Sequence, residues 1–208
     1  MKHLPVLLVL GFALSLCNLT NKLKPSSNSG GPGKTASSDS GDTAEKAAPT
    51  EAQTAALAGG SAAKWDQQGM SWTVPPKWKE SSNESKMLVW RSPGSWDAAS
   101  MIVSISPLGE DFPIDTSIKA FYDGAKTRSK NGEVDELKWL EIDGLKGVQF
   151  REANPEKPDG IRRLQWMGYR KYAGQVQLIN FILSSSGKGF PQHEDAMYGV
   201  LYSMKIVH

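Results

Sequence analysis

Histidine and cysteine side chains carry most metal binding and much acid–base and nucleophilic chemistry, and this chain of 208 residues has three histidines and one cysteine. Cys17 lies near the N-terminus, and His3 and His208 lie at or near the chain ends. His193 is therefore the single histidine inside the aromatic-rich part that begins at Trp65. A zinc centre needs three or four ligands, supplied mostly by His and Cys. The composition excludes a His-rich metal site, and we expect no metal and no cofactor.

His193 could serve as the base of a Ser-His-Asp arrangement. The segment FPQHEDA places it beside two carboxylates, Glu194 and Asp195, in the first turn of a predicted helix. A histidine in that setting is usually solvated rather than catalytic. We therefore predict that the chain is not an enzyme, that it has no catalytic residue, and that His193 is dispensable.

Paired carboxylates offer a second route to catalysis. Asp135 and Glu136, or Glu141 and Asp143, could act as the acid and base of a glycosidase if they faced each other about 5 to 10 Å apart across a cleft. A sequence gives no such distance, and acidic residues beside a hairpin turn also promote solubility. A hydrolase acting on cell-wall glycan is therefore kept as the alternative function.

Two segments have the composition of a binding surface. The segment RSPGSWDAAS holds Trp96 in a loop that follows Arg91, and aromatic and arginine side chains on loops are typical interface anchors. The segment IRRLQWMGYRKY interleaves arginines, including Arg163, with aromatic residues, although alternate residues of a strand take opposite faces. We predict that Trp96, Arg91 and Arg163 bind a partner. The alternative for Trp96 is a side chain that folds back to cover the core.

The N-terminal residues indicate where the protein works. Lys2 precedes an apolar run, Leu4 to Leu16, that has the layout of a secretory signal. This run is shorter than a membrane-spanning helix, which needs roughly 18 to 20 apolar residues. Cleavage after the small residues ALS, residues 13–15, would give a secreted protein. The segment LSLC instead resembles a bacterial lipobox, and that resemblance implies lipid attachment at Cys17. Leu16 departs from the motif, which has a small residue there.

Residues 18–64 contain no aromatic residue and consist mostly of small and polar types that cannot bury a core. We interpret them as a disordered tether, with residues 1–17 as the signal peptide and residues 65–208 as the folded domain. A tether between a cysteine and a domain favours a lipid anchor over simple secretion. The expected location is the bacterial cell envelope, lipid-anchored outside the cytoplasm, with secretion as the alternative.

The predicted domain has no cysteine and holds equal numbers of basic and acidic residues. A domain of this size buries about two thirds of its unfolded surface without needing disulfides. Its balanced charge gives no field that would attract nucleic acid. Besides the membrane, we expect the partner to be an unknown envelope protein or cell-wall component, and we expect no nucleic acid.

Hydrophobic periodicity predicts the secondary structure of the domain. Strands are predicted at residues 70–75, 86–91, 100–106, 134–142, 145–153, 161–172 and 175–184. Two-residue hairpin turns are predicted at Asp143-Gly144 and Ala173-Gly174. A helix is predicted at residues 115–132, with Asp115 as its cap, and a second from Pro191 onward.

The second helix has an apolar stripe formed by Met197, Val200, Leu201 and Met204. Residues 175–183 are apolar at positions that face both sides of a strand, so both faces of the sheet need cover. The strands are grouped instead of alternating with helices. The predicted fold class is therefore α+β, one antiparallel sheet covered by helices on both faces.

A resemblance to the PsbP superfamily begins at the segment GMSWTVPPKWKE, and its matching residues are Gly69, Trp72, Pro75, Pro76 and Trp78. The hairpin EIDGLKGVQF and a C-terminal helix that runs into LYSMKIV are also similar, and the resemblance covers most of residues 65–206. The superfamily includes Mog and envelope lipoproteins of the DcrB/LpqN kind. The resemblance implies an α/β/α sandwich that acts as a non-catalytic binding or assembly module, and it carries over no active-site residue.

Overall fold

The computed structural model describes residues 43–207. Their elements, in chain order, are β1 (Glu45–Lys46), α1 (Glu51–Ala56), β2 (Ser61–Trp65), the short 3-10 helix η1 (Asp66–Gln68), β3 (Met70–Val74), β4 (Lys79–Glu84), β5 (Met87–Arg91), β6 (Ser100–Leu108), α2 (Ile114–Lys130), β7 (Val134–Ile142), β8 (Leu145–Glu152), β9 (Ile161–Tyr172), β10 (Gln175–Ser186), α3 (Phe190–Tyr202) and β11 (Lys205–Ile206).

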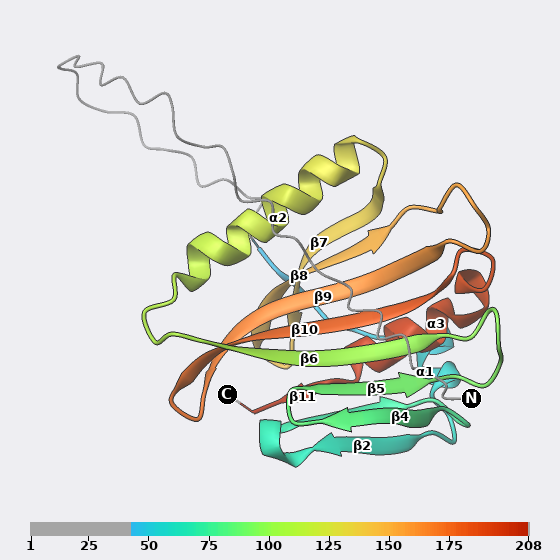
Figure 1. Cartoon of the computed structure of the whole chain (residues 1–208), viewed down its shortest axis with the longest axis horizontal. Helices are drawn as coiled ribbons and strands as arrows, with labels where there is room; N and C mark the ends of the chain where they lie inside the picture. The colour runs from blue at the N-terminus through green and yellow to red at the C-terminus, as the bar shows by residue number, and fades with distance from the viewer. Residues whose placement is uncertain (1–42, 208) are drawn as a thin grey trace, which may run out of the picture. The chain divides into compact units, whose positions relative to one another are not determined.

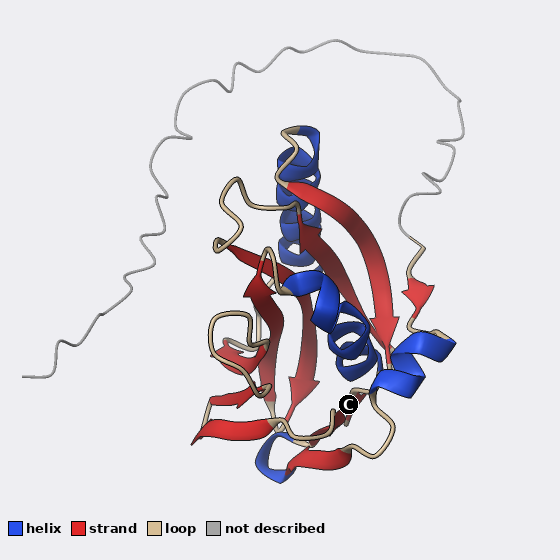
Figure 2. Cartoon of the chain, turned by 90° about the vertical axis from the view of Figure 1, so that its right-hand side faces the viewer, coloured by secondary structure: helices blue, strands red, loops and turns tan. Residues whose placement is uncertain are grey.

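The strands form two sheets (Figures 1 and 2). The larger has eight strands in the order β1-β7-β8-β9-β10-β6-β5-β4, antiparallel throughout except for the parallel pair β1–β7, and the smaller has the order β11-β3-β2. Helix α2 packs against β7, β8 and β9, whereas α3 packs against β9, β10 and β3. The predicted α+β fold, with helices on both faces of a sheet, is confirmed.

Both predicted hairpin turns are present. Asp143 and Gly144 have φ values of 49° and 86°, and Ala173 and Gly174 have 50° and 76°. Positive φ at both central residues gives the type of turn whose twist matches that of paired strands. These turns set the register of β9 on β10 and of β7 on β8. In the β7–β8 pair, Ile142 faces Leu145.

Strand β10 shows how differently the two faces of the sheet are covered. Ile179, Phe181 and Leu183 are fully buried in the main core, together with the apolar side of α3. On the opposite face Val176 is buried in the smaller core under α2, but Ile182, farther along the strand, is only half-buried. The second face is therefore closed by α2 at one end and open at the other.

The two predicted helices are present, with one correction. Helix α2 begins at Ile114 with Pro113 at the cap position and no side-chain capping bond, so Asp115 lies in the first turn and is not the cap. Proline fixes φ near the helical value and thus starts a helix without a capping side chain. The stripe of α3 is buried as predicted, although its last member, Met204, follows the helix.

The predicted boundary between tether and domain at residue 65 is too late. Strand β1 pairs with β7, and β2 pairs with β3 along its whole length. Thr50 and Gln53 form a capping box at the start of α1, and a Cβ at Gly199 of α3 would lie 2.7 Å from the carbonyl oxygen of Gln53. The absence of a side chain at Gly199 allows this close approach of the two helices. The signal peptide, Cys17 and residues 18–42 lie outside the described residues.

Truncation at two positions tests the corrected boundary. Removal of residues 1–42 should leave the melting temperature unchanged, because residues 1–17 are the predicted signal peptide and residues 18–42 are mostly small and polar. Removal of residues 1–64 should lower it by roughly 5 to 10 °C, because β3 loses its partner β2 and the buried Ala63 is lost. Calorimetry of the two truncated chains beside the full chain makes the comparison. Equal melting temperatures for both truncations would show that residues 43–64 add nothing to the fold.

Candidate binding surface

Trp96 is the large apolar side chain most exposed to solvent among those described, with 93% of its surface accessible. It lies in the loop 92–99 that joins β5 to β6. The alternative in which Trp96 folds back over the core is therefore wrong. Its role as a binding residue stays a prediction, because no partner is present.

Two hydrogen bonds close the base of this loop. The Ser92 amide donates to the Ala99 carbonyl oxygen at 2.9 Å, and the Ala99 amide donates to Ser92 Oγ at 2.8 Å. Ser92 and Ala99 are both buried. Satisfied and buried polar groups hold a loop in one conformation. The exposed indole thus stands on a fixed base.

The tip of the loop is attached to two other elements through one carbonyl group. The Asp97 carbonyl oxygen accepts hydrogen bonds from Ser185 Oγ of β10 at 2.8 Å and from His193 Nε2 of α3 at 2.9 Å. A carbonyl oxygen only accepts, so Nε2 of His193 carries the proton. A Cβ at Gly189, just before α3, would lie 2.7 Å from the same oxygen. His193 therefore positions the residue next to Trp96.

The other two predicted binding residues lie at the same end of the sheet. Arg91 faces Ser100, Ser100 faces Ser184, and Ser184 faces Arg163 on successive strands. Directly opposed residues share one face, so both arginines project from the face that α2 leaves open, about 14 Å apart across three strand spacings. The two serine hydroxyls between them are 2.9 Å apart. The structure thus brings Arg91 and Arg163 together with the loop of Trp96, which starts and ends in this row.

Apolar side chains adjoin the row of arginines and serines. Ile161, 52% exposed, precedes Arg163 by two residues and so lies on the same face. On the other side of the row, Val89, Ile102 and Ile182 face one another across three strands and are half-buried. We call the end of the sheet formed by Arg91, Ile161, Arg163 and the two serines, together with the adjoining loop of Trp96, the Trp96 surface. The arginines project from the face opposite α3, whereas the loop contacts Ser185 and His193 on the α3 side. The surface offers an apolar anchor, hydroxyl groups and two cations to a partner, of which Arg163 also pairs with Glu152 at 3.1 Å.

Three of the four carboxylates considered for catalysis, Asp135, Glu136 and Asp143, have structural partners. Asp143 accepts a bond from the Ile206 amide at 2.8 Å and pairs with Lys205 at 3.1 Å. Asp135 pairs with Arg151 at 2.7 Å and with Arg162 at 2.5 Å. Within residues 43–207, no group of three or more His, Cys, Asp or Glu side chains could hold a metal ion. In the same range, no helix is both long enough and apolar enough to cross a membrane.

A polar cluster between β7, β8 and α3 escaped sequence analysis. The Tyr198 hydroxyl donates to Glu136, which also accepts from Gln149 Nε2 at 2.7 Å, and Arg151 pairs with Glu194. Glu194 and Tyr198, four residues apart on a predicted helix, lie on one side of it. The predicted turn at Asp143-Gly144 also places Glu136 opposite Arg151, but no local pattern places α3 against this pair.

Burial and charge determine the protonation states in this cluster. Burial raises the pKa of Tyr198, and its hydrogen bond to the Glu136 carboxylate raises that pKa further. Burial lowers the pKa of Arg151, but Asp135 and Glu194 outweigh it and the pKa rises above its usual value. The tyrosine stays neutral and the arginine charged at every physiological pH. The cluster therefore binds α3 to the sheet, and neither Tyr198 nor Arg151 exchanges protons near neutral pH.

The raised pKa of Tyr198 predicts a loss of stability in alkali. The unfolded tyrosine loses its proton near pH 10 while the folded one keeps it, so this contribution is complete below about pH 10 and declines above it. Tyr198→Phe should lower the free energy of unfolding by about 1 to 2 kcal/mol at pH 7. Above pH 10, the free energy of unfolding of the variant should decrease less steeply than that of the wild-type protein. Denaturant unfolding of both proteins from pH 8 to 11.5, roughly, measures the difference. A difference in unfolding free energy between the two proteins that stays constant with pH would contradict the raised pKa of Tyr198.

No family model matches the sequence, and no curated protein matches it. Solved structures resemble the fold. LpqN of Mycobacterium tuberculosis, described as involved in cell envelope biogenesis, has a TM-score of 0.52 at 14% identity, over 72% of this chain and 86% of LpqN. Cyanobacterial PsbP (CyanoP) of Synechocystis sp. PCC 6803 has 0.45 at 15% identity, over 71% of this chain and 92% of CyanoP.

The Ran-binding protein Mog1p of Saccharomyces cerevisiae has a TM-score of 0.42 at 9% identity, over 71% of this chain and 95% of Mog1p. The chain spans about half, 49%, of a Bacteroides thetaiotaomicron protein with a TM-score of 0.43, 11% identity and 72% of this chain covered. Identities this low show the fold alone. The described domain has the PsbP-like fold that the segment around Trp72 predicted.

Proposed function

We propose that this chain is a lipid-anchored protein of the bacterial cell envelope whose PsbP-like domain binds an envelope protein or cell-wall component without catalysis. The exposure of Trp96 on a fixed loop is the observation that carries the proposal. Leaving a tryptophan in water forgoes about 2 to 3 kcal/mol of burial free energy that a core position would give. A partner that covers the indole recovers that free energy.

The surroundings of Trp96 support binding rather than chance exposure. Tryptophan and arginine are the residue types most enriched among side chains that dominate binding free energy. The bonds from Ser185 and His193 to Asp97 order the loop before a partner arrives, which reduces the entropy lost on association. Arg91, at the base of the loop, can pair with carboxylate or phosphate groups of the partner, and Arg163, in the same row of residues, can do so by exchanging its ion pair with Glu152.

The absence of catalysis is proposed from the partners of the acidic residues. Asp135 and Asp143, which a glycan hydrolase would need free, are held in ion pairs. Tyr198 keeps its proton near neutral pH. His193 donates to a backbone carbonyl group that it positions. These candidates for acid–base chemistry thus have structural roles, which favours binding over the hydrolase alternative.

The location is proposed from the N-terminal sequence. The apolar leader ends at Cys17, and residues 18–42 of the predicted tether separate that cysteine from β1. A lipid at Cys17 would hold the domain at a membrane while the tether lets the Trp96 surface reach a partner. LpqN, which shares the fold, is described as involved in cell envelope biogenesis. That setting agrees with the proposal, although the likeness itself concerns only the fold.

Trp96→Ala should weaken partner capture without unfolding the domain. We expect a loss of affinity of about 30-fold or more, the size of an interface hot spot, and a change in unfolding free energy within about 0.5 kcal/mol. The partner is first identified by crosslinking the intact protein in its own envelope, and its affinity is then measured by calorimetry. Phe121→Ala is the matched control, because Phe121 is an exposed aromatic residue on α2.

Equal losses for Trp96→Ala and Phe121→Ala would remove the Trp96 surface from the proposal. A lower melting temperature for Trp96→Ala would show that the indole stabilises the domain instead.

Cys17→Ser should abolish lipid attachment. Metabolic labelling with a fatty-acid probe should mark the wild-type protein and leave Cys17→Ser unlabelled, since the thiol is the only cysteine in the chain. The mutant should also move from the membrane fraction to the soluble fraction. Equal labelling of both proteins, or labelling of neither, would contradict lipid attachment at Cys17 and leave simple secretion as the explanation.

A further inference from the structure

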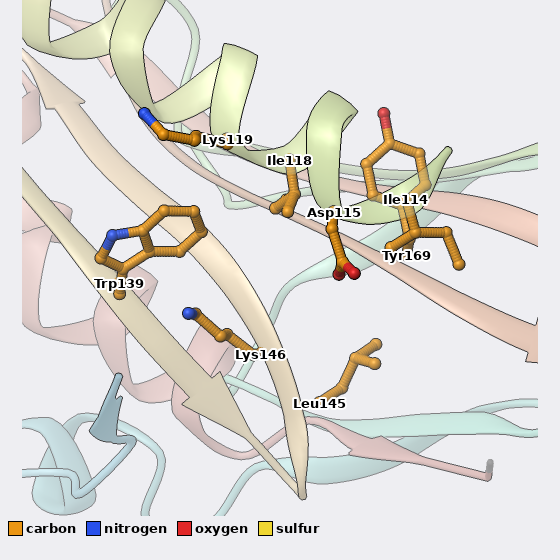
Figure 3. Close-up of a pocket in the computed structure, with 8 residues that line it drawn as sticks. All are labelled: Ile114, Asp115, Ile118, Lys119, Trp139, Leu145, Lys146 and Tyr169. Carbon is orange, nitrogen blue, oxygen red and sulfur yellow. The ribbon is translucent and has the colours of Figure 1, made fainter. Parts of the chain in front are cut away.

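A pocket of about 410 Å³ lies between the start of α2 and the β7–β8 hairpin (Figure 3). It is at the opposite end of β9 from Arg163, so it is separate from the Trp96 surface. Its apolar lining consists of Ile114, Ile118, Trp139, Leu145 and Tyr169. Both the volume and the apolar lining are typical of pockets that bind small molecules.

The aromatic walls of this α2 pocket are held in place from behind. Trp139 is 5% exposed and stacks on Tyr122 with ring centroids 4.6 Å apart and planes at 8°. Tyr169 packs on Phe112 at a centroid distance of 5.3 Å. Rings fixed in this way need no rearrangement to accept a ligand, which removes one cost of binding.

Three charged side chains share the pocket with these walls. Lys146 Nζ lies 4.3 Å from the centroid of the Trp139 ring, and Figure 3 shows its side chain and the Asp115 carboxylate in the space between α2 and the hairpin. Lys119, on the next turn of α2, pairs with Asp123 at 2.7 Å on the exposed side of the helix. Exposed pairs of this kind are weak and exchange readily with other anions. The pocket thus has two cations and one anion.

The start of α2 adds to the positive side of this balance. Ile114 and Asp115 are the first two residues of the helix, and no side chain caps its first turn. The amide groups at the start of a helix carry a partial positive charge that attracts anions. Together with Lys146, this charge outweighs the single carboxylate of Asp115, while Lys119 is balanced by Asp123.

We propose that the α2 pocket binds a small aromatic or apolar molecule that carries one anionic group. The apolar body of the ligand packs against Trp139 and Tyr169, and its anionic group lies between Lys146 and the start of α2. The proposal is independent of the Trp96 surface, because a separate set of residues carries it.

Two fluorescent probes that differ by one charge test this directly. Anilinonaphthalene sulfonate has an aromatic body and a sulfonate, and phenylnaphthylamine has the same rings without the sulfonate. Titration of the full chain with each probe gives two dissociation constants. We expect one site for the sulfonate and an affinity about five-fold higher than for the neutral probe, as one favourable charge contact near the protein surface provides.

Charge variants then locate the site. Lys146→Gln should weaken the sulfonate about five-fold and Asp115→Asn should strengthen it about two- to five-fold, with the neutral probe changed less than two-fold in each. Lys126→Gln, an exposed lysine farther along α2, is the matched control and should change neither probe. Melting curves of all variants confirm that they are folded.

Three results would overturn the proposal. The first is no binding of either probe to the wild-type chain, which would mean that the pocket accepts no such body. The second is equal affinity for both probes, which would remove the anionic group from the ligand class. The third is a sulfonate affinity that Lys146→Gln and Asp115→Asn leave unchanged, which would place the probe elsewhere. Capture of a partner by the Trp96 surface is unaffected by any of these results.

Discussion

Strand β10 carries apolar side chains on both of its faces, and the domain covers these faces to different extents. On one face, Phe181 and its neighbours meet α3 and form a closed core. On the other face, the 17 residues of α2 pack mainly against β7, β8 and β9, and Ile182 is left half-buried. The positions of both candidate sites follow from this unequal cover. The α2 pocket lies where this helix meets the sheet, and the Trp96 surface lies at the end of the sheet that α2 does not reach.

Near the open end of the sheet, the row of Arg91, Ser100, Ser184 and Arg163 presents polar side chains. Val89 and Ile102, one row inward, are then partly shielded by neighbouring side chains. Trp96 is the exception to this arrangement, since it stands 93% exposed on a loop whose conformation is fixed. His193 also contributes to this fixed loop. A histidine that first suggests a catalytic base donates instead to the carbonyl group of Asp97.

Much of the fold was predictable because local signals determine it. The turns at Asp143-Gly144 and Ala173-Gly174 require only adjacent residues, and the stripe of α3 only helical periodicity. The order of strands, the pairing of β1 with β7 and the packing of α1 on Gly199 depend on distant contacts that no local pattern encodes. Residue types indicated Trp96, Arg91 and Arg163. Their meeting at one end of the sheet depends on the register of four strands, which sequence alone does not supply.

The central claim is that the loop of Trp96 is ordered before any partner binds. Nuclear magnetic resonance relaxation of the backbone amides of residues 94–97 in the free protein measures this most directly. We predict order parameters near 0.85, as in rigid elements, and a clear decrease when Ser185→Ala and His193→Ala remove both donors to the Asp97 carbonyl. Order parameters below about 0.6 in the wild-type protein would contradict the claim, because the indole would then stand on a mobile loop.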